Sequence, residues 1–227
     1  MNTVNRRDFA KSVGALSLIS AAGITGCASI GGIAKPKVVV VGGGYGGATA
    51  AKYIAMWSEG KIDVTLVERD AQFISCPLSN LVLGGSKSMG DISVAYGGLA
   101  KYGVKQVRGE ATGFDATKKT LSLADGTTLD YDRLILSPGI DFMLESLPGL
   151  ASAEARSKVL AAWKAGPETV ALRNQLVAMK DGGVYAIHIP KAPYRCPPGP
   201  YERACQVAWY FQQAKPKSKV LILDANE

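Results

Sequence analysis

The sequence predicts an α/β protein built around a parallel β-sheet, and three observations support this. Lys37–Val41 is a short β-branched run, typical of a strand buried on both faces. Ala48–Met56 is small and apolar, which favours a helix packed closely on a sheet. Residues 62–69, "IDVTLVER", form a second apolar run that ends at an acid. Strand, helix and strand in this order predict a βαβ unit with parallel strands.

A glycine motif, G-x-G-x-x-G, lies between the first predicted strand and its helix. Glu68 follows Gly47 by 21 residues, the spacing of the acid that binds a ribose hydroxyl in dinucleotide-binding folds. The glycines permit a tight turn, and the helix N-terminus offers amides and a positive dipole end to a pyrophosphate. The residues assigned to this predicted dinucleotide site are Gly42, Gly44, Tyr45, Gly47, Glu68 and Arg69.

The next part of the chain has the composition of short strands and turns. Residues 93–102 suggest a helix, and residues 104–136 suggest strands separated by turns at "TKK" and "ADG". The last of these strands ends at Ser137-Pro138-Gly139. This turn either brings backbone amides near a cofactor or is an ordinary turn. Residues 151–180 are helical in composition.

A second βαβ unit begins with a strand at 184–190 and continues with a helix at 201–214 and a strand at 218–224. It lacks a glycine motif and instead has Cys196 among prolines, which remove the amide donors that a phosphate needs. Arg195 and the following helix N-terminus favour the thiolate form of Cys196. The alternative is a structural cysteine in a turn. One βαβ unit cannot close a core, so we expect a longer protein or partner chains.

The N-terminus has the pattern of a bacterial export signal. Twin arginines, Arg6 and Arg7, precede an apolar stretch too short to span a bilayer comfortably. This order predicts export of the folded protein to the periplasm. Cys27 lies in "ITGCA", which is either a lipoprotein box, giving a membrane anchor, or a plain cleavage site. The predicted division is a signal (1–34), an N-terminal dinucleotide-binding domain (35–150), a helical connection (151–181) and a second domain (182–227).

Composition excludes some classes of function. The net charge is +7, but Lys and Arg form no run, so we expect no nucleic acid partner. The four cysteines form neither a C-x-x-C pair nor a C-x-x-C-H haem site. His188 is the only histidine, so we expect it to pack in the core and expect no metal site. Cys205 is expected on the core face of its helix.

From Lys35 to Glu227 the sequence resembles the flavoprotein subunit of flavocytochrome c sulfide dehydrogenase, one of the two-dinucleotide-domain flavoprotein disulfide reductases. The motifs that carry the resemblance are "VVVVGGGYGGATAAKYI", "CPLSN", "YDRLILSPGI", "AWKAG" and "APYRCPPGPYERACQVA". The resemblance implies a Rossmann-like FAD-binding domain and the start of a second dinucleotide-binding-like domain, in a chain that lacks the family's C-terminal half.

The resemblance also implies roles for individual residues. Cys76 would bond covalently to the flavin 8α carbon, and Ala111 with the turn Ser137, Pro138 and Gly139 would line FAD. Cys196 would be half of a redox disulfide whose partner lies beyond this chain. Glu202 either handles protons or complements the dipole of its helix.

The activity implied is oxidation of hydrosulfide, with electrons passed to a separate c-type cytochrome subunit in a heterodimer. Sulfide:quinone oxidoreductase is the nearest alternative. An NADH-dependent reductase is disfavoured because the second unit lacks the glycine motif. An alternative of another class is a truncated, non-catalytic FAD-binding fragment.

Overall fold

The computed structural model describes residues 34–144 and 147–226. The predicted export signal, apart from Ala34, and Cys27 lie outside the described residues. Lys35 onward forms one unit, described below. Within the described ranges, no helix combines the length and the hydropathy needed to cross a membrane.

The first part of the chain is organised on a four-stranded parallel sheet with the order β5-β2-β1-β9. Its strands are β1 (Lys37–Val41), β2 (Asp63–Glu68), β5 (Lys105–Arg108) and β9 (Arg133–Leu136). The three central residues of β1 are buried, as predicted for a strand covered on both faces. The predicted α/β class is therefore confirmed.

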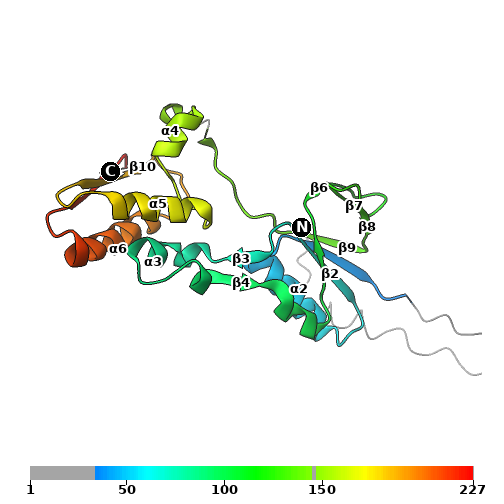
Figure 1. Ribbon diagram of the computed structural model, residues 1–227. Helices are drawn as coiled ribbons and strands as arrows, with labels where there is room; N and C mark the ends of the chain where they lie inside the picture. Colours follow the sequence, from blue (N-terminus) through cyan, green and yellow to red (C-terminus); the bar gives the residue numbers. More distant parts are fainter. Residues whose placement is uncertain (1–33, 145–146, 227) are drawn as a thin grey trace, which may run out of the picture. The chain divides into compact units, whose positions relative to one another are not determined.

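Different elements cover the two faces of this sheet (Figure 1). Helix α2 (Tyr45–Trp57) packs on one face through Ala51 and Ala55, whose small side chains allow close approach. The other face is covered by an antiparallel meander. Its strands are β6 (Ala111–Asp115), β7 (Thr120–Leu123) and β8 (Thr128–Asp130).

The chain leaves the sheet through short elements. After β2 come β3 (Gln72–Ile74), η1 (Cys76–Leu78) and α3 (Ser79–Gly84). They are followed by η2 (Gly90–Ile92), β4 (Ser93–Ala95), which pairs antiparallel with β3, and the 3-10 helix η3 (Tyr96–Tyr102). The helix expected at 93–102 is thus wrong for its first three residues, which form β4 because they pair with β3.

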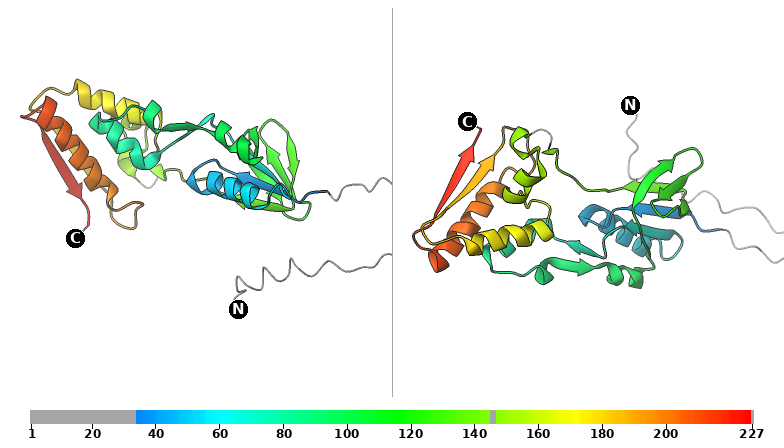
Figure 2. Two further views of the ribbon diagram at one scale, coloured as in Figure 1. Left: turned by 90° about the horizontal axis from the view of Figure 1, so that it is seen from below. Right: turned by 45° about the horizontal axis from the view of Figure 1, so that its top comes forward.

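The last part of the chain is the predicted second βαβ unit. Strands β10 (Val184–Ile189) and β11 (Lys219–Asp224) are parallel, and α6 (Gly199–Ala214) lies along them in both views of Figure 2. Helices α5 (Pro167–Ala178) and α3 pack against α6. On β11, Leu221, Ile222 and Leu223 are exposed.

Residues 151–180, predicted to be helical from their composition, are helical only in part. Residues 148–150 form η5 (Pro148–Leu150), followed by α4 (Ala153–Lys158) and α5, but residues 159–166 are not helical. Ala162 has φ of 49°, outside helical geometry, and its N–H donates to the Glu168 carboxylate. Tertiary hydrogen bonds therefore replace helical ones in this segment.

Candidate functional site

The turn after β1 requires glycine at two of the three motif positions. Gly42 has φ of 95°, and a Cβ there would lie 2.0 Å from the Ser137 carbonyl oxygen. A Cβ at Gly47 would lie 1.8 Å from the Gly42 carbonyl oxygen. Side chains at both positions are thus excluded by backbone atoms. Nothing lies within 4 Å of a Cβ built at Gly44, so that position is open.

The N-terminus of α2 faces this turn without a side-chain cap. Gly44 is its N-cap residue, and no acidic side chain lies in the first turn. The first N–H groups of a helix lack intrahelical partners and attract anions. Turn and helix end together therefore fit the pyrophosphate of a dinucleotide.

The acid at the end of β2 lies against the same turn. Glu68 Oε2 accepts a hydrogen bond from the Gly43 amide at 2.6 Å, and Oε1 accepts one from the Asp70 amide at 2.9 Å. The Tyr96 ring fills the space where a Gly43 side chain would point. Burial, with the charges of Glu68 and Asp70 as smaller causes, raises the pKa of Tyr96 to about 12. Glu68 thus lies beside the glycine turn, and its role as the ribose-binding acid stays a prediction.

The turn after β9 contacts the glycine motif. The Ser137 amide donates to the Val41 carbonyl at 2.8 Å, and the Ser137 side chain borders the helical glycines. Gly139 has φ of 82°, which reverses the chain. The turn therefore lies against the glycine motif, and its lining of a cofactor stays a prediction.

Three other residues were assigned to the cofactor, namely Tyr45, Arg69 and Ala111. Tyr45 is exposed, and its hydroxyl lies 2.6 Å from Ser75 Oγ. Arg69 lies at the surface, with Nη1 3.5 Å from a carboxylate oxygen of Glu110. Ala111 begins β6 and packs against the core beneath the meander.

Cys76 begins η1 directly after β3, and its sulfur is held by a distant backbone group. Cys76 Sγ donates a hydrogen bond to the Trp163 carbonyl oxygen at 2.7 Å. Ser79 Oγ donates to the Cys76 carbonyl at 2.8 Å and fixes the turn. The sulfur of an exposed cysteine is thereby oriented.

Cys196 lies beside the same tryptophan. Its φ is 60°, in the left-handed region, within the loop before α6. A Cβ built on Gly199 would lie 3.1 Å from both Cys196 Sγ and Trp163 Cζ3, so sulfur and indole pack over this glycine. Cys76 thus contacts the backbone of Trp163, and Cys196 lies near its indole ring; the family resemblance implies flavin chemistry for both cysteines.

Arg203 completes this cluster, although sequence reasoning did not assign it. The side chain is only 3% exposed, on the face of α6 that also buries Val207 and Phe211. Its guanidinium carbon lies 3.6 Å from the centroid of the Trp163 ring, a cation–π contact. The sequence signal was weak, because one arginine among polar helix residues normally indicates a solvated face.

Comparison with known proteins shows which family shares this geometry. The family described as pyridine nucleotide-disulphide oxidoreductase matches residues 36–175, more than half of the chain. The chain belongs to this family. A second family, the central part of the sulfide dehydrogenase (flavocytochrome c) flavoprotein chain, matches residues 169–227.

Individual relatives agree with both assignments. Over 46 residues the chain is 54% identical to the sulfide dehydrogenase flavoprotein chain of Chlorobaculum thiosulfatiphilum, covering 20% of this chain and 94% of that sequence. Over 114 residues it is 31% identical to the mitochondrial sulfide:quinone oxidoreductase of Dictyostelium discoideum, covering 50% of this chain. The chain spans about a quarter of the length of that protein (25%). The resemblance noted from sequence is therefore confirmed.

Solved structures show the same fold. The sulfide:quinone oxidoreductase of Aquifex aeolicus superposes with a TM-score of 0.62 at 20% identity, over 83% of this chain and 43% of that one. NDH2 of Plasmodium falciparum superposes with a TM-score of 0.64 at 17% identity, over 83% and 41%. The two-part dinucleotide-binding architecture of this oxidoreductase family is confirmed.

In the second dinucleotide-like unit, neighbouring residues hydrogen-bond to the acid that ends the last strand. Asp224 ends β11, the place where a dinucleotide fold has its ribose-binding acid. The Tyr201 hydroxyl donates to Asp224 Oδ2, and the Asn226 amide donates to Oδ1 at 2.9 Å. These bonds lower the pKa of the Asp224 carboxyl, with Tyr201 as the larger cause. Both carboxylate oxygens are already engaged.

Three other expectations have mixed outcomes. Glu202 lies exposed in the first turn of α6, a position that suits dipole complementation and leaves its proton-handling role a prediction. The expectation that Cys205 faces the core is wrong, because its side chain is exposed on α6. His188 is also exposed, on β10, so its expected packing in the core is wrong.

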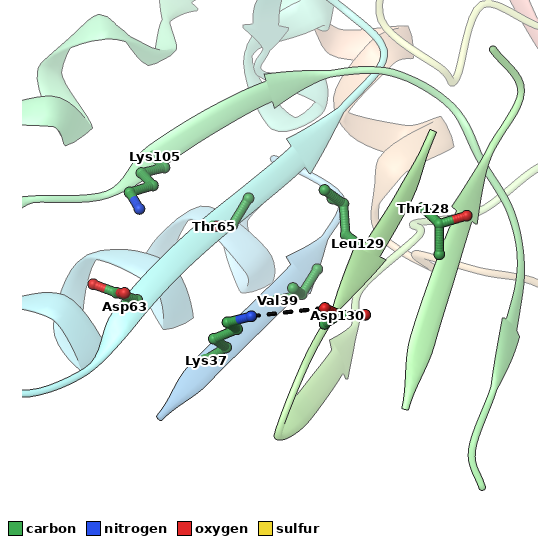
Figure 3. Close-up of a pocket in the computed structure, with 8 residues that line it drawn as sticks. All are labelled: Lys37, Val39, Asp63, Thr65, Lys105, Thr128, Leu129 and Asp130. Atoms are coloured by element: carbon green, nitrogen blue, oxygen red, sulfur yellow. Dashed lines mark ion pairs between the residues drawn. The ribbon is translucent and has the colours of Figure 1, made fainter. Parts of the chain in front are cut away.

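A cavity of about 300 Å³ lies away from these sites (Figure 3). It is lined at the amino-terminal ends of β1 and β2, whereas the glycine turn follows the carboxyl end of β1. Lys37 and Asp130 form an ion pair across it, with 3.7 Å between nitrogen and oxygen. Because ligands of such sheets bind at the carboxyl ends of strands, we assign no cofactor to this cavity.

Proposed function

We propose that this chain is the FAD-binding part of a sulfide dehydrogenase flavoprotein, which oxidises hydrosulfide and passes the electrons to a c-type cytochrome subunit. The observation that carries the proposal is the gathering of Cys76 and Cys196 around Trp163. A covalent anchor for the flavin and a redox thiol beside it need this proximity. The identity with the Chlorobaculum flavoprotein chain supports the same function.

The residues present fit FAD. The turn Gly42–Gly47 and the amides of α2 would bind the pyrophosphate, and Glu68 would accept the ribose hydroxyls. The Ser137–Gly139 turn and Ala111 would line the cofactor, and Cys76 would hold it through a thioether to the 8α carbon. When bound, FAD supplies a two-electron acceptor that can release electrons singly.

The substrate chemistry is assigned to Cys196. Hydrosulfide attacks a disulfide that contains Cys196, forming a new sulfur–sulfur bond and breaking the old one, so that a persulfide and a thiolate result. FAD, when bound, would accept the electron pair of this sulfur chemistry. Arg195 precedes Cys196, and the N-terminus of α6 follows shortly after it. The family resemblance implies that the second cysteine of the disulfide belongs to the family's C-terminal half.

The N-terminal sequence supports a location for the protein. Arg6, Arg7 and the apolar stretch support export to the periplasm by the twin-arginine route, where disulfides persist. Lipidation at Cys27 would tether the protein to a membrane.

Other acceptors and donors are less well supported. A sulfide:quinone oxidoreductase shares the fold and 31% identity, and it differs in the acceptor. NADH as electron donor is disfavoured, because prolines at 197, 198 and 200 remove amides from the loop and Tyr201 occupies Asp224. A non-catalytic FAD-binding fragment remains the alternative of another class.

The test is sulfide-dependent reduction by the FAD-loaded chain together with the segment that supplies the second cysteine, with cytochrome c and a soluble quinone offered separately. We expect reduction of cytochrome c, loss of at least about 100-fold in Cys196→Ser, and full activity in the control Cys205→Ser. Preference for quinone would support the sulfide:quinone alternative. Tight FAD binding without reduction of either acceptor would support the alternative that the chain is a non-catalytic FAD-binding fragment.

A further inference from the structure

The outer face of α2 is apolar and aromatic, whereas the outer face of a surface helix is normally charged. Trp57 is 73% exposed and Met56 is 37% exposed, and both lie in the last turn of the helix, beside Tyr53. The ring centroids of Tyr53 and Trp57 are 4.9 Å apart, so the two rings form one continuous surface. The inner face of α2 is already packed on the sheet through Ala51 and Ala55. An exposed patch of this kind indicates a partner for the outer face.

Two lysines border these rings and connect α2 to η3. The Lys52 ammonium lies 5.1 Å from the centroid of the Tyr53 ring and 5.2 Å from that of the Tyr102 ring. The Lys101 ammonium lies 5.1 Å from the same Tyr102 ring. Neither lysine forms an ion pair in the part of the chain that the structure describes. The sequences of α2 and η3 contain no Asp or Glu. We call the following side chains the α2–η3 surface: Lys52, Tyr53, Met56, Trp57, Lys101 and Tyr102.

The α2–η3 surface extends toward the amino-terminal end of the parallel sheet. Helix α2 runs back along β1, and its last residue, Trp57, precedes the start of β2 at Asp63. Asp63 pairs in register with Lys37 at the start of β1. β5 begins at Lys105, shortly after η3, at the same end of the sheet. The glycine turn follows the opposite end of β1, so a partner that contacts Trp57 leaves that turn free.

We propose that the α2–η3 surface is a membrane-contact site that binds the headgroup region of an anionic lipid bilayer. Trp and Tyr are enriched in that region because their rings are apolar and their N–H or hydroxyl groups reach water. Lysines beside the rings attract the phosphates of anionic lipids. Because α2 has 13 residues, fewer than a spanning helix needs, it would lie along the bilayer.

The size of the surface favours lipid over a second protein. Each partner of a stable protein–protein interface contributes about 20–30 residues, far more than the α2–η3 surface offers. A bilayer needs only a few aromatic side chains with neighbouring cations. The net charge of +7 also favours an anionic surface. This site is independent of the proposed sulfide chemistry.

Quenching of Trp57 fluorescence by lipid tests the proposal. The vesicles contain phosphatidylglycerol and phosphatidylcholine brominated near the headgroup end of its chains. We expect them to quench the chain, and Trp57→Phe to reduce that quenching at least about threefold. Trp209→Phe is the matched control, because Trp209 is also exposed, on α6, and its variant should keep the quenching. Residues 1–34 are the same in every protein compared. Quenching that is unchanged in Trp57→Phe would overturn the proposal.

Lysine variants test the preference for anionic lipid. Replacing Lys52 and Lys101 together by Gln should raise the lipid concentration at half-maximal quenching about tenfold. The matched control replaces Lys180 and Lys217 by Gln, which removes the same charge from exposed positions beside the second βαβ unit and should change it less than about twofold. Equal effects of the two double variants would contradict a site on α2 and η3. If the variant at Lys52 and Lys101 does not fold by circular dichroism, Lys101→Gln alone decides.

Other occupants of the surface would give other results. A second copy of the chain would appear in sedimentation velocity as a dimer that Trp57→Ser converts to a monomer, without lipid quenching. Vesicle binding without quenching at Trp57 would show attachment through residues 1–34. The titration is repeated on the chain together with the segment that supplies the second cysteine, and loss of quenching there would show that this segment covers Trp57. Each of these results overturns the proposal, and quenching that depends on Trp57 in both forms supports it.

Discussion

Cys76 and Trp163 lie 87 residues apart in the sequence, and the sulfur of one donates to the carbonyl oxygen of the other at 2.7 Å. This hydrogen bond joins the segment that leaves the dinucleotide-binding sheet to the segment between α4 and α5. Trp163 also borders Cys196 and Arg203. The direction of the Cys76 sulfur therefore depends on the backbone at Trp163, in an irregular stretch of the chain.

Gly47→Ala should destabilise the chain and weaken FAD binding. The added methyl group would lie 1.8 Å from the Gly42 carbonyl oxygen, which is backbone and cannot rotate away. We expect a loss of about 2–3 kcal/mol in the free energy of unfolding, from overpacking in a closely packed turn. Gly44→Ala is the control, because its position is open, and should change stability by less than about 0.5 kcal/mol. Urea unfolding followed by circular dichroism measures both; equal losses would contradict the geometry of the turn.

Tyr96 should make the chain less stable at high pH. Its folded-state pKa of about 12 exceeds the ordinary value of 10.0, so its contribution is fully present below pH 10 and is lost between pH 10 and 12. Because the ring is partly exposed, we expect the loss in the free energy of unfolding to be only about 1 kcal/mol. The measurement is the difference in unfolding free energy between wild type and Tyr96→Phe at pH 9 and at pH 11.5. If the difference in unfolding free energy between wild type and Tyr96→Phe is the same at both pH values, ionisation of Tyr96 does not affect stability.

Glu168→Ala should loosen the segment that presents the Trp163 carbonyl. The variant leaves the Ala162 amide without its 2.8 Å partner and removes an acid from the first turn of α5. A loss of about 1–2 kcal/mol in stability is expected, together with slower retention of FAD on Cys76. Glu154→Ala is the matched control, since that acid also lies in the first turn of a helix but pairs with exposed Lys158. Thermal unfolding and flavin retention after denaturation distinguish the two.

NADH should be a poor reductant of the FAD-loaded chain. Asp224 is engaged by Tyr201 and Asn226, and the loop before α6 lacks the glycines that admit a pyrophosphate. We expect sulfide to reduce the flavin at least about 100-fold faster than NADH in stopped-flow absorbance at equal concentrations. Fast reduction by NADH would instead align the chain with the NADH-dependent members of its family.

The sequence was informative where local patterns decide structure. The unit β1–α2–β2, its glycine turn and Glu68 could be predicted because apolar periodicity and the needs of a tight turn are local properties. Residues 159–166 could not, because their alanine-rich composition favours a helix, whereas the nearby Glu168 and the distant Arg203 take their backbone groups instead. The prediction that Cys205 faces the core was wrong for a related reason. Which face of α6 is buried depends on what packs against it, and the buried face carries an arginine.

The contacts of Trp163 also give the protein an optical reporter. The chain has three tryptophans, and Trp57 and Trp209 are 73% and 50% exposed. Replacing those two by phenylalanine leaves an indole that touches a cation and lies beside the sulfur of Cys196. Fluorescence from that single ring would then follow alkylation, oxidation or flavin capture in real time, without a label on either cysteine.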